Sequence, residues 1–426
     1  MKVAFYTLGC KLNQAETESL VNDFRLDGFH IVSPDALADI YIANTCTITH
    51  IADRKSRHWL RVARRKNPQA LVIATGCYAQ RSRQELARLA DLVAGNDDKE
   101  NLVDLTRAFL TEAQGLAEDD TQRPQPSYAG TRVRSLIRIQ DGCHSSCTYC
   151  IVPHVRPQEF SLPPHRIVGE IQDRVARGYR EVVLTGTKIG SYWSKGTDLR
   201  GLVQHVLRSI PIERLRISSL QPSDIYPDFL TLWEDERLCQ HFHLALQSGS
   251  STVLRRMGRG YSPDDYRRAL DLIRDRMPES SITTDIIVGF PGESDEEFEQ
   301  SYSFCRESRF ANIHLFPFSA RPGTAAADMP ERVEVSVRRE RNRRMLELSR
   351  EARLRYYERF LGRTMQVLWE KETDPGRGIY SGLTANYLRV FAGSDRSLSN
   401  ELTPARLLEA RAEGMQAEVM NVPALR

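Results

Sequence analysis

The sequence predicts an α/β protein with an N-terminal parallel α/β domain, a central partial (βα)6 barrel and a small C-terminal β-barrel. Strand-like and helix-like segments alternate up to residue 110 and again from residue 132. A polar stretch with two prolines separates the two series, and short strand candidates follow residue 362. A chain of 426 residues is long for one domain. The expected parts are 1–117, a linker at 118–130, 131–361 and 362–426.

In the N-terminal part, apolar strand candidates alternate with segments of helical periodicity. The strand candidates are Lys2–Thr7, Asp39–Ala43 and Ala70–Thr75. The helix candidates are Glu16–Leu26, Asp53–Arg65 and Ser82–Leu89. This alternation implies a parallel sheet with right-handed crossovers.

The central part repeats the strand-helix pattern six times, at intervals of about 30–40 residues. The strand candidates are Val133–Ile139, Glu181–Thr185, Arg214–Ser219, Phe242–Leu246, Ile282–Val288 and Asn312–Phe318. The helices between them include Pro164–Arg177, Asp264–Arg276 and Asp295–Ser308. Six repeats favour a partial barrel over a closed eightfold barrel, although six strands also fit an open sheet.

A long helix, Val335–Leu361, ends at Gly362 and introduces the C-terminal part. Short strand candidates follow it, with turn residues between them: Thr364–Glu370, Gly378–Thr384, Tyr387–Phe391 and Met415–Val419. This pattern predicts a small β-barrel module.

Composition indicates a cytoplasmic protein with no membrane contact. Hydrophobic residues make up 41% and charged residues 27%, which is ordinary for a globular chain. No segment approaches the roughly 20 apolar residues of a membrane span, and the N-terminus does not resemble a signal peptide. Eight cysteines in such a chain point to metal or redox chemistry rather than disulfides. Cys239 and Cys305 stand alone in predicted helices, and we expect them to be small buried hydrophobes.

Cys143, Cys147 and Cys150 form a CxxxCxxC triplet just after the first strand of the central part. Three thiolates so close together can bind three irons of a 4Fe-4S cluster and leave the fourth iron open. A small molecule can chelate that iron, which is the arrangement that radical S-adenosylmethionine (SAM) chemistry needs. The alternative is a zinc knuckle, but zinc prefers four ligands, and His144 is sterically awkward beside Cys143.

Cys10, Cys46 and Cys77 are far apart in the sequence, but each one closes an apolar strand. In a parallel sheet the carboxyl ends of the strands lie along one edge, so these three thiols are expected to converge. Gly9 and Gly76 precede two of them and permit tight turns. We therefore predict a second cluster with an open iron, against the alternative of three unrelated buried thiols.

The net charge of +3 is nearly neutral, but basic residues are concentrated in two runs. Residues 54–66 hold seven basic residues and no acidic one, and residues 338–359 hold nine arginines against four glutamates. Such runs are usually solvated helix faces; the alternative is contact with nucleic acid. The first run begins eight residues after Cys46, so its helix should lie near the second cluster. The RNA-binding candidates are Arg54, Lys55, Arg57, Arg61, Arg64 and Arg65. His58 and Trp59 are candidates for base stacking, with a core-facing tryptophan as the favoured alternative.

These motifs together resemble the radical SAM methylthiotransferases, and the resemblance covers nearly the whole chain. It rests on GCKLNQ at 9–14, NTCT at 44–47, GCYAQ at 76–80, LQSGS at 246–250, TDIIVGFPGE at 284–293 and RPGT at 321–324. Lys11-Leu12-Asn13 favours the branch that acts on threonylcarbamoyladenosine in tRNA. The C-terminal module resembles the TRAM domain, a small RNA-binding β-barrel. Residues 155–163, VRPQEFSLP, depart from the basic run that the family usually carries after its third cysteine, and a glutamate is expected near Gln221.

The resemblance implies two 4Fe-4S clusters, SAM as methyl donor and radical source, and a methylthio group placed on adenine C2 at position 37 of tRNA. The implied partners are the tRNA anticodon stem-loop and an electron donor such as flavodoxin or ferredoxin. The predicted SAM contacts are Tyr149, Gly186, Gly190, Gln247, Ser248 and Asp285, with plain βα turns as the alternative for the two glycines. Alternatives within the class are methylthiolation of isopentenyladenosine or of a ribosomal-protein aspartate. An alternative of another class is a structural iron–sulfur RNA-binding protein.

Overall fold

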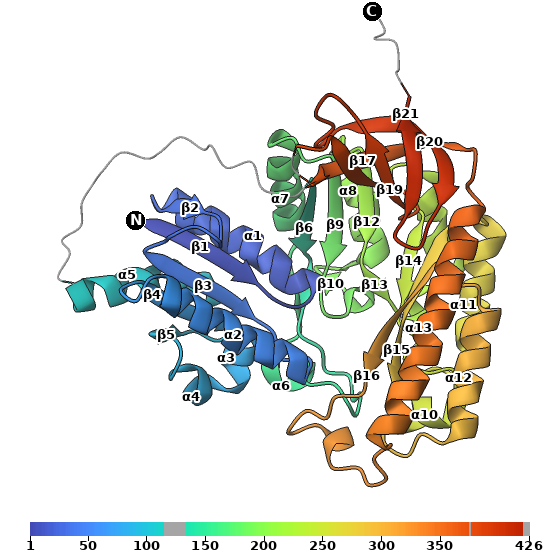
Figure 1. Ribbon diagram of the computed structural model, residues 1–426, viewed down its shortest axis with the longest axis horizontal. Helices are drawn as coiled ribbons and strands as arrows, with labels where there is room; N and C mark the ends of the chain where they lie inside the picture. Colours follow the sequence, from blue (N-terminus) through green and yellow to red (C-terminus); the bar gives the residue numbers. More distant parts are fainter. Residues whose placement is uncertain (115–132, 375, 421–426) are drawn as a thin grey trace, which may run out of the picture.

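The structure is a computed structural model that describes residues 1–114, 133–374 and 376–420. The predicted linker at 118–130 lies outside the described residues. Three parts face a common centre: an N-terminal α/β layer, a half-open barrel and a small β-barrel above it (Figure 1). Within the described ranges, no helix has the length and apolar character that crossing a membrane requires.

The N-terminal part is a five-stranded parallel sheet with strand order β2-β1-β3-β4-β5. The strands are β1 (Lys2–Thr7), β2 (His30–Val32), β3 (Ile40–Thr45), β4 (Leu71–Gly76) and β5 (Leu92–Val93). The helices are α1 (Lys11–Leu26), α2 (His50–Lys66), α3 (Cys77–Arg81), α4 (Arg83–Leu86) and α5 (Leu102–Gln114), with a 3-10 turn η1 (Lys99–Asn101).

Both faces of this sheet are covered, as parallel sheets require. Ile40 and Ile42 of β3 pack with residues of α1 and α5, whereas Tyr41 and Ala43 pack with residues of α2 and α3. The predicted parallel sheet is confirmed. α1 begins at Lys11, five residues before the predicted start, so the helix follows Cys10 directly.

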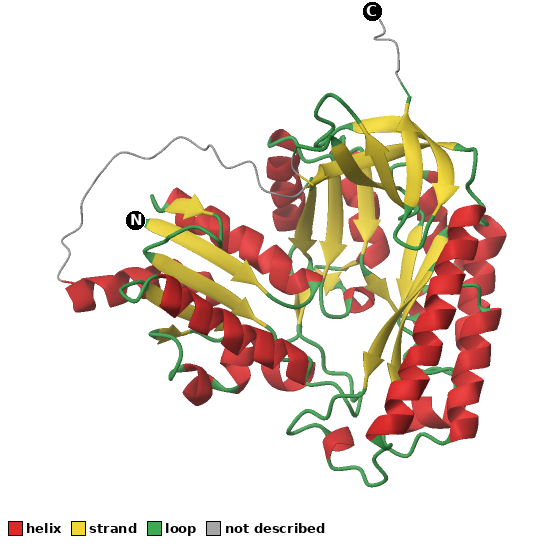
Figure 2. Cartoon of the chain, in the orientation of Figure 1, coloured by secondary structure: helices red, strands yellow, loops and turns green. Residues whose placement is uncertain are grey.

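The central part holds two curved parallel sheets, ordered β12-β9-β6 and β13-β14-β15-β16, with helices on the outside (Figure 2). The strands are β6 (Arg134–Arg138), β9 (Glu181–Thr185), β12 (Arg214–Ile217), β13 (Ser219–Leu220), β14 (His241–Leu244), β15 (Ser281–Val288) and β16 (Asn312–Pro317). Two short antiparallel pairs join β7 (Gln140–Asp141) to β8 (Phe160–Ser161) and β10 (Trp193–Ser194) to β11 (Thr197–Asp198). The predicted partial (βα)6 barrel is confirmed.

The helices of the central part are α6 (Val152–Val155), α7 (Pro164–Ala176), α8 (Leu199–Ser209), α9 (Pro227–Leu230), α10 (Ser251–Arg256), α11 (Pro263–Arg276), α12 (Asp295–Glu307) and α13 (Val335–Glu358). Four 3-10 turns accompany them: η2 (Ile189–Ser191), η3 (Pro222–Asp224), η4 (Thr231–Glu234) and η5 (Ala325–Ala327). Of the helices of the central part, α8, α11 and α12 begin at side-chain caps. Ser262 and Ser294 form capping boxes with Asp265 and Glu297, which fix the starts of α11 and α12.

The C-terminal part is a closed five-stranded barrel with strand order β17-β18-β19-β21-β20. The strands are β17 (Thr364–Asp374), β18 (Ile379–Thr384), β19 (Arg389–Gly393), β20 (Leu402–Ala410) and β21 (Met415–Val419). Tyr356, Tyr357 and Phe360, at the end of α13 and just beyond it, pack into its core around Trp369. The predicted β-barrel is confirmed, and it contains one strand, β20, that the sequence did not predict.

Candidate active site

Cys10, Cys46 and Cys77 follow the adjacent strands β1, β3 and β4, at the end where all three strands terminate. The register pairs Thr7 with Asn44 and Thr45 with Gly76, so the three strand ends are level. A Cβ on Gly9 would lie 2.9 Å from Cys46 Sγ, so only glycine fits this close approach. The charges of Cys77 and Cys10 act on the pKa of Cys46, as expected for converging thiols. The predicted convergence is therefore present in the structure.

Two asparagine side chains organise this edge. Asn13 Nδ2 donates to the carbonyls of Leu8 (2.9 Å) and Thr45 (3.0 Å), just before Cys10 and Cys46. Asn96 Nδ2 donates to Cys77 Sγ (3.7 Å) and to the Val155 carbonyl (2.7 Å). Burial raises the pKa of Cys46 to about 12, so the free thiol stays protonated, and a bound cation is needed to make it a thiolate.

Cys143, Cys147 and Cys150 lie in the loop after β7. Thr148 fixes this loop: its amide donates to the Met257 carbonyl, and its carbonyl accepts from Ala326. Arg259 Nη1 donates to Cys147 Sγ (3.2 Å), which places a positive charge beside the thiol. The His144 ring lies 2.8 Å from the Pro157 carbonyl and is exposed, so it does not complete a zinc site with the cysteines.

Both triplets fit a cubane cluster better than a single ion. Across the residues that the structure describes, no three His, Cys, Asp or Glu side chains are arranged to hold one metal ion. A 4Fe-4S cluster instead spreads its thiolates over separate irons, so its ligands need not meet at one point. All eight cysteines are free. Cys305 is buried in α12 as predicted, whereas Cys239 lies in an extended segment before β14 and not in the predicted helix, because its amide pairs with the Leu215 carbonyl at a strand edge.

The two triplets are neighbours. Cys77 packs against Ile151 and Val155, which follow Cys150. Beside this contact lies the Arg156 cluster, which comprises Arg156, Asn13, Glu16, Lys99 and Asp141. Arg156 donates to Glu16 (2.8 and 2.9 Å), Asp141 (2.8 and 2.6 Å) and Asn13 Oδ1 (3.0 Å), and Lys99 also donates to Glu16. This cluster ties the helix after Cys10 to the segment after Cys150.

A second buried ion pair joins the N-terminal part to the barrel. Arg321 Nη2 donates to Asp53 (2.6 Å) and to Thr47 Oγ1 (2.9 Å), and the Arg321 side chain is 1% exposed. Thr47 follows Cys46, so the loop after β16 is anchored to the edge that carries the first triplet.

The unusual segment after Cys150 is ordered by the barrel itself. Phe160 of β8 pairs with Asp141 of β7. Glu159 accepts from the His144 amide (2.9 Å) and from Ser191 Oγ (2.8 Å). Arg156 is the basic residue in this segment that reaches the thiol triplets.

The predicted SAM contacts divide into two groups. Asp285 and Gln247 meet at the strand ends, where the Gln247 amide donates to the Asp285 carbonyl (2.8 Å), and Tyr149 packs edge-on to Phe290. Gly186 and Gly190 press against Gln140 and Asp224, since a Cβ would lie 2.6 Å from the Gln140 carbonyl oxygen and 2.1 Å from an Asp224 carboxylate oxygen. Ser248 is fully buried, and its hydroxyl lies 3.0 Å from that of Ser301 in α12. These assignments stay predictions.

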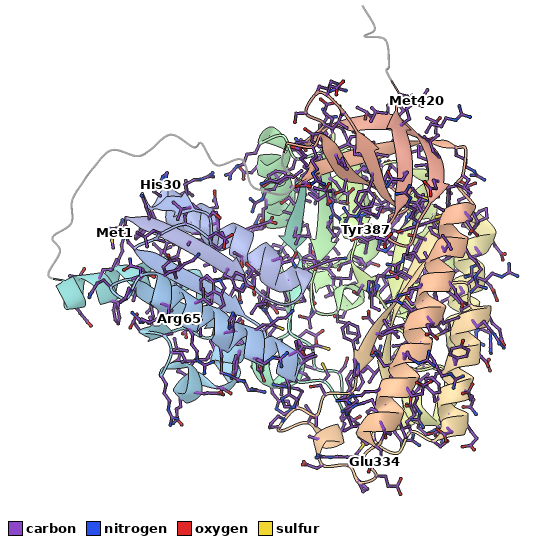
Figure 3. All side chains as sticks on the ribbon, viewed as in Figure 1. Met1, His30, Arg65, Glu334, Tyr387 and Met420 are labelled. Atoms are coloured by element: carbon purple, nitrogen blue, oxygen red, sulfur yellow. The ribbon has the colours of Figure 1, made fainter. Side chains whose placement is uncertain are left out.

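The basic run lies on α2, and its members are not equivalent. Arg57 donates to the Tyr78 hydroxyl and pairs with Glu85 (3.1 Å), and Arg64 pairs with Asp91 (2.5 Å). The exposed members are Arg54, Lys55, Arg61, Arg65 and Lys66, of which Arg65 is labelled in Figure 3. Trp59 is buried and stacks on Tyr6 at 4.7 Å, so the core-facing alternative is confirmed.

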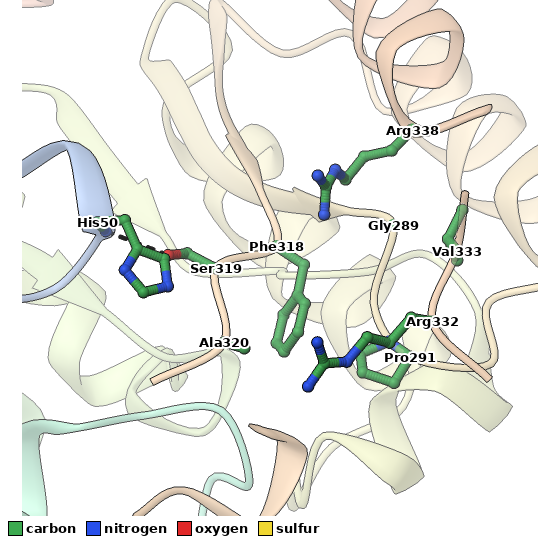
Figure 4. Close-up of a pocket in the computed structure, with 9 residues that line it drawn as sticks. All are labelled: His50, Gly289, Pro291, Phe318, Ser319, Ala320, Arg332, Val333 and Arg338. Atoms are coloured by element: carbon green, nitrogen blue, oxygen red, sulfur yellow. Dashed lines mark hydrogen bonds between the residues drawn. The ribbon is translucent and has the colours of Figure 1, made fainter. Parts of the chain in front are cut away.

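A cavity of about 210 Å³ lies at the start of α2, beside the loops that follow β15 and β16 (Figure 4). Its lining includes His50, Phe318 and Pro291, with the guanidinium groups of Arg332 and Arg338 extending toward it. His50 donates its amide hydrogen to Ser319 Oγ (3.2 Å), which joins the two walls.

Sequence reasoning missed Asn13, Asn96 and Arg156 as site residues. Asn13 lies in the GCKLNQ motif, and Arg321, a further residue of the site, lies in the RPGT motif. Their positions in these motifs are the signal that could have identified them. Asn96 and Arg156 carry no local signal, because their side-chain partners lie 15 to 143 residues away.

Family models match both the N-terminal part and the central part of the chain. A family model described as Radical SAM superfamily matches residues 137–305, and one described as Uncharacterized protein family UPF0004 matches residues 2–95. Threonylcarbamoyladenosine tRNA methylthiotransferase MtaB of Aquifex aeolicus (strain VF5) is 37% identical over 401 residues, which cover 92% of this chain and 96% of that protein. The protein of the same name from Bacillus subtilis (strain 168) is 34% identical and covers 96% of this chain and 94% of its own.

A relative with a different substrate name is also similar. The tRNA-2-methylthio-N(6)-dimethylallyladenosine synthase of Syntrophotalea carbinolica is 33% identical over 96% of this chain and 97% of that protein. Among solved structures, the radical SAM methyltransferase TsrM of Kitasatospora setae superposes with a TM-score of 0.55 at 14% identity, covering 76% of this chain and 75% of that one. At this identity the likeness concerns the fold.

Proposed function

Because the chain belongs to the radical SAM tRNA methylthiotransferase family, we propose that it attaches a methylthio group to C2 of N6-threonylcarbamoyladenosine at position 37 of tRNA, beside the anticodon. The observation that carries this proposal is the proximity of two cysteine triplets, one at the edge of the N-terminal sheet and one in the barrel. One triplet alone accounts for radical formation, and the second gives a place to hold the sulfur that is transferred.

The enzyme uses two 4Fe-4S clusters and SAM. When bound, these groups supply the methyl group, the sulfur and the radical that replacement of the unreactive C2 hydrogen demands. We assign Cys10, Cys46 and Cys77 to one cluster and Cys143, Cys147 and Cys150 to the other. Tyr149, Gln247 and Asp285 are the proposed SAM contacts that lie near the second triplet or the strand ends.

The chain's own residues hold these groups in place and exclude solvent. Arg156 fixes the distance between the triplets, because it donates three hydrogen bonds to Glu16 and Asn13 of α1 and two to Asp141 of β7. Arg259 donates to Cys147 Sγ (3.2 Å) and places a guanidinium charge beside the second triplet. The buried pair of Arg321 and Asp53 keeps the barrel closed against the N-terminal part.

The proposed RNA path follows the exposed basic face of α2. Arg54, Lys55, Arg61 and Arg65 offer charge to phosphates, and the cavity lined by Arg332 and Arg338 lies at the start of the same helix. An unpaired loop base must leave its stack to reach the buried site, which suits an anticodon loop. We propose residues 1–117 as the cluster domain, 131–361 as the SAM domain and 362–426 as the RNA-binding module, with flavodoxin or ferredoxin as electron donor.

Two measurements test the proposal. Anaerobic reconstitution should give about eight irons per chain and release 5′-deoxyadenosine with dithionite. Mass spectrometry of tRNA nucleosides from a strain lacking the protein should show loss of the methylthio form of threonylcarbamoyladenosine. Loss of methylthio-isopentenyladenosine instead would reassign the substrate, and about four irons without SAM cleavage would contradict the activity.

A further inference from the structure

The inner face of the barrel carries polar side chains that neither cysteine triplet uses. In β14, β15 and β16 the register places His241 beside Ser281, His243 beside Thr283 and Asp285 beside His314. The alternate residues Phe242, Ile282 and Ile313 pack in the outer hydrophobic core. Because side chains alternate along a strand, the histidines, Thr283 and Asp285 all point into the barrel.

These inner side chains form a connected polar group. His243 Nδ1 lies 2.9 Å from Thr283 Oγ1, and His243 Nε2 lies 3.2 Å from Asp285 Oδ2. His241 Nε2 lies 3.2 Å from the same Thr283 hydroxyl, and its Nδ1 is buried without a partner among the described residues. Asp285 is 27% exposed and His314 is exposed, so the group is open at one end and closed at the His241 end.

The C-terminal barrel closes this end. Tyr387 lies in the turn between β18 and β19 with a φ of +68°, and its ring stacks on His241 with centroids 4.3 Å apart. Figure 3 shows Tyr387 at the centre of the molecule, below the C-terminal barrel. The Arg216 guanidinium lies 4.7 Å from the centre of the same ring.

Positive charge is in excess around the closed end. The buried carboxylate of Glu181 faces two guanidinium groups, those of Arg216 (2.8 Å) and Arg214 (3.8 Å). Lys11, half-buried at the start of α1, adds its charge to the field felt by Tyr387, His314 and Asp285. Although burial raises the pKa of Tyr387, the charges of Arg134, Lys11 and Arg216 hold it below its ordinary value. This field favours a bound anion.

We propose that Lys11 and His314 bind the carboxylate and hydroxyl of the threonylcarbamoyl substituent of the target adenosine, within a pocket lined by His243 and closed by His241 and Tyr387. This inference rests on the proposed function and names the residues that select its substrate. The group on N6 lies on the same edge of the purine as C2, since both flank N1. Lys11 follows Cys10, so a base whose C2 faces the first triplet presents its N6 substituent toward Lys11.

The pocket also disfavours a hydrocarbon substituent. An isopentenyl group has no carboxylate or hydroxyl, so it would desolvate the Lys11 ammonium and the exposed His314 imidazole and offer them no polar partner in return. A site built for polar contacts rejects an analogue that lacks them far more strongly than an apolar site rejects an added group. The preference for threonylcarbamoyladenosine is therefore expected to come from this pocket.

The test compares two anticodon stem-loops that differ at one group. One carries threonylcarbamoyladenosine, and the other carries the same nucleoside with its carboxylate replaced by a carboxamide. The iron-loaded wild type should favour the carboxylate by about 100-fold in kcat/KM, with a matching preference in the dissociation constant of the stem-loop. Lys11→Gln should lose this preference, and Lys11→Arg should keep most of it. Arg268→Gln, an exposed charge on α11, is the matched control and should behave as wild type.

The outcomes separate the two proposals. Equal preference for the carboxylate in wild type and Lys11→Gln would overturn the pocket while the proposed function stands. If the wild type modifies only an isopentenyl stem-loop, the proposed function fails, and the pocket with it. Because Lys11 adjoins Cys10, iron content is measured for each variant, and if Lys11→Gln loses iron then His314→Gln carries the test. His314→Gln should reduce the preference by about tenfold with full iron content, and an unchanged ratio would overturn the pocket.

Discussion

Replacing Arg156 by methionine tests whether the Arg156 cluster holds the two cysteine triplets together. The guanidinium is 4% exposed and donates to Glu16, Asp141 and Asn13 at 2.6–3.0 Å. Methionine has a similar length but no donors, so two buried carboxylates lose a shared cation. Among the described residues, Asp141 would keep only Arg138, at 3.5 Å, as an ion-pair partner. Breaking a buried pair in this way costs about 3–5 kcal/mol of unfolding free energy.

The assay is urea unfolding of the iron-free protein under anaerobic conditions, followed by tryptophan fluorescence. Arg138→Met is the control, since Arg138 reaches the same carboxylates at 3.5–4.0 Å and is 23% exposed, and it should cost less than about 1 kcal/mol. Adding Asp141→Asn to Arg156→Met should recover about 1–3 kcal/mol, because it removes a buried charge that has lost its nearer partner and keeps only Arg138 at 3.5 Å. A cost below about 1 kcal/mol for Arg156→Met would refute this account of the cluster.

The same variant has a defined pH dependence. Burial by itself raises the pKa of Glu16, but the charges of Lys99 and Arg156 and their hydrogen bonds hold it well below its usual range. A depressed carboxyl pKa stabilises the fold above the unfolded value of about 4.3 and loses that contribution as pH falls toward the folded pKa. The difference in unfolding free energy between wild type and Arg156→Met should therefore be largest above about pH 4.3 and shrink below it.

Three further predictions follow from the site and the fold. Arg321→Met leaves Asp53 with Arg81, at 3.1 Å, as its one ion-pair partner in the described chain, beside the Thr47 hydroxyl at 2.6 Å, and should cost about 3 kcal/mol in urea unfolding; a loss no greater than that of the exposed control Arg83→Met would contradict it. Ser294→Ala removes the cap of α12 and should cost about 1 kcal/mol, measured in the same way; no change in the urea midpoint would contradict the capping assignment. Joint reversal of three exposed charges, Arg54, Arg61 and Arg65, to glutamate should weaken stem-loop binding and lower the salt slope of log K by about 2 with iron content unchanged; an unchanged slope would remove α2 from the RNA path.

The fold was largely predictable because its strands are apolar and its helices are periodic. β1 and β9 match their predicted bounds, and the strand ends that carry the first triplet followed from the parallel topology. β20 was missed because its sequence, LTPARLLEA, contains a proline and several strong helix formers. Pairing with β17 and β21 overrides that local preference, and such pairing is visible only in three dimensions.

The cysteines of the candidate site could be predicted from the sequence, but the residues that hold them in place could not. Six cysteines carry spacing or strand-end signals, whereas Arg156 lies in a segment that departs from the family pattern. Its role depends on Glu16, 140 residues away, and no local property of either residue announces the pair. Lys11 stood out only as a marker of the family branch. Its charge acts on Tyr387 and His241 only because three parts of the chain meet.

The contact between the central part and the C-terminal barrel determines whether the enzyme can work without that barrel. Arg214 and Arg216 of the barrel donate to the carbonyls of Leu383, Gln366 and Ala385, which belong to the C-terminal barrel. Removing residues 362–426 would remove these hydrogen bonds from two buried guanidinium groups. It would also remove Tyr387, which closes the His241 end of the pocket. The C-terminal barrel is therefore part of the wall of the proposed pocket, in addition to the RNA-binding role that we propose for it. A truncated enzyme should fail on a free nucleoside as well as on tRNA, which a detachable binding module would not predict.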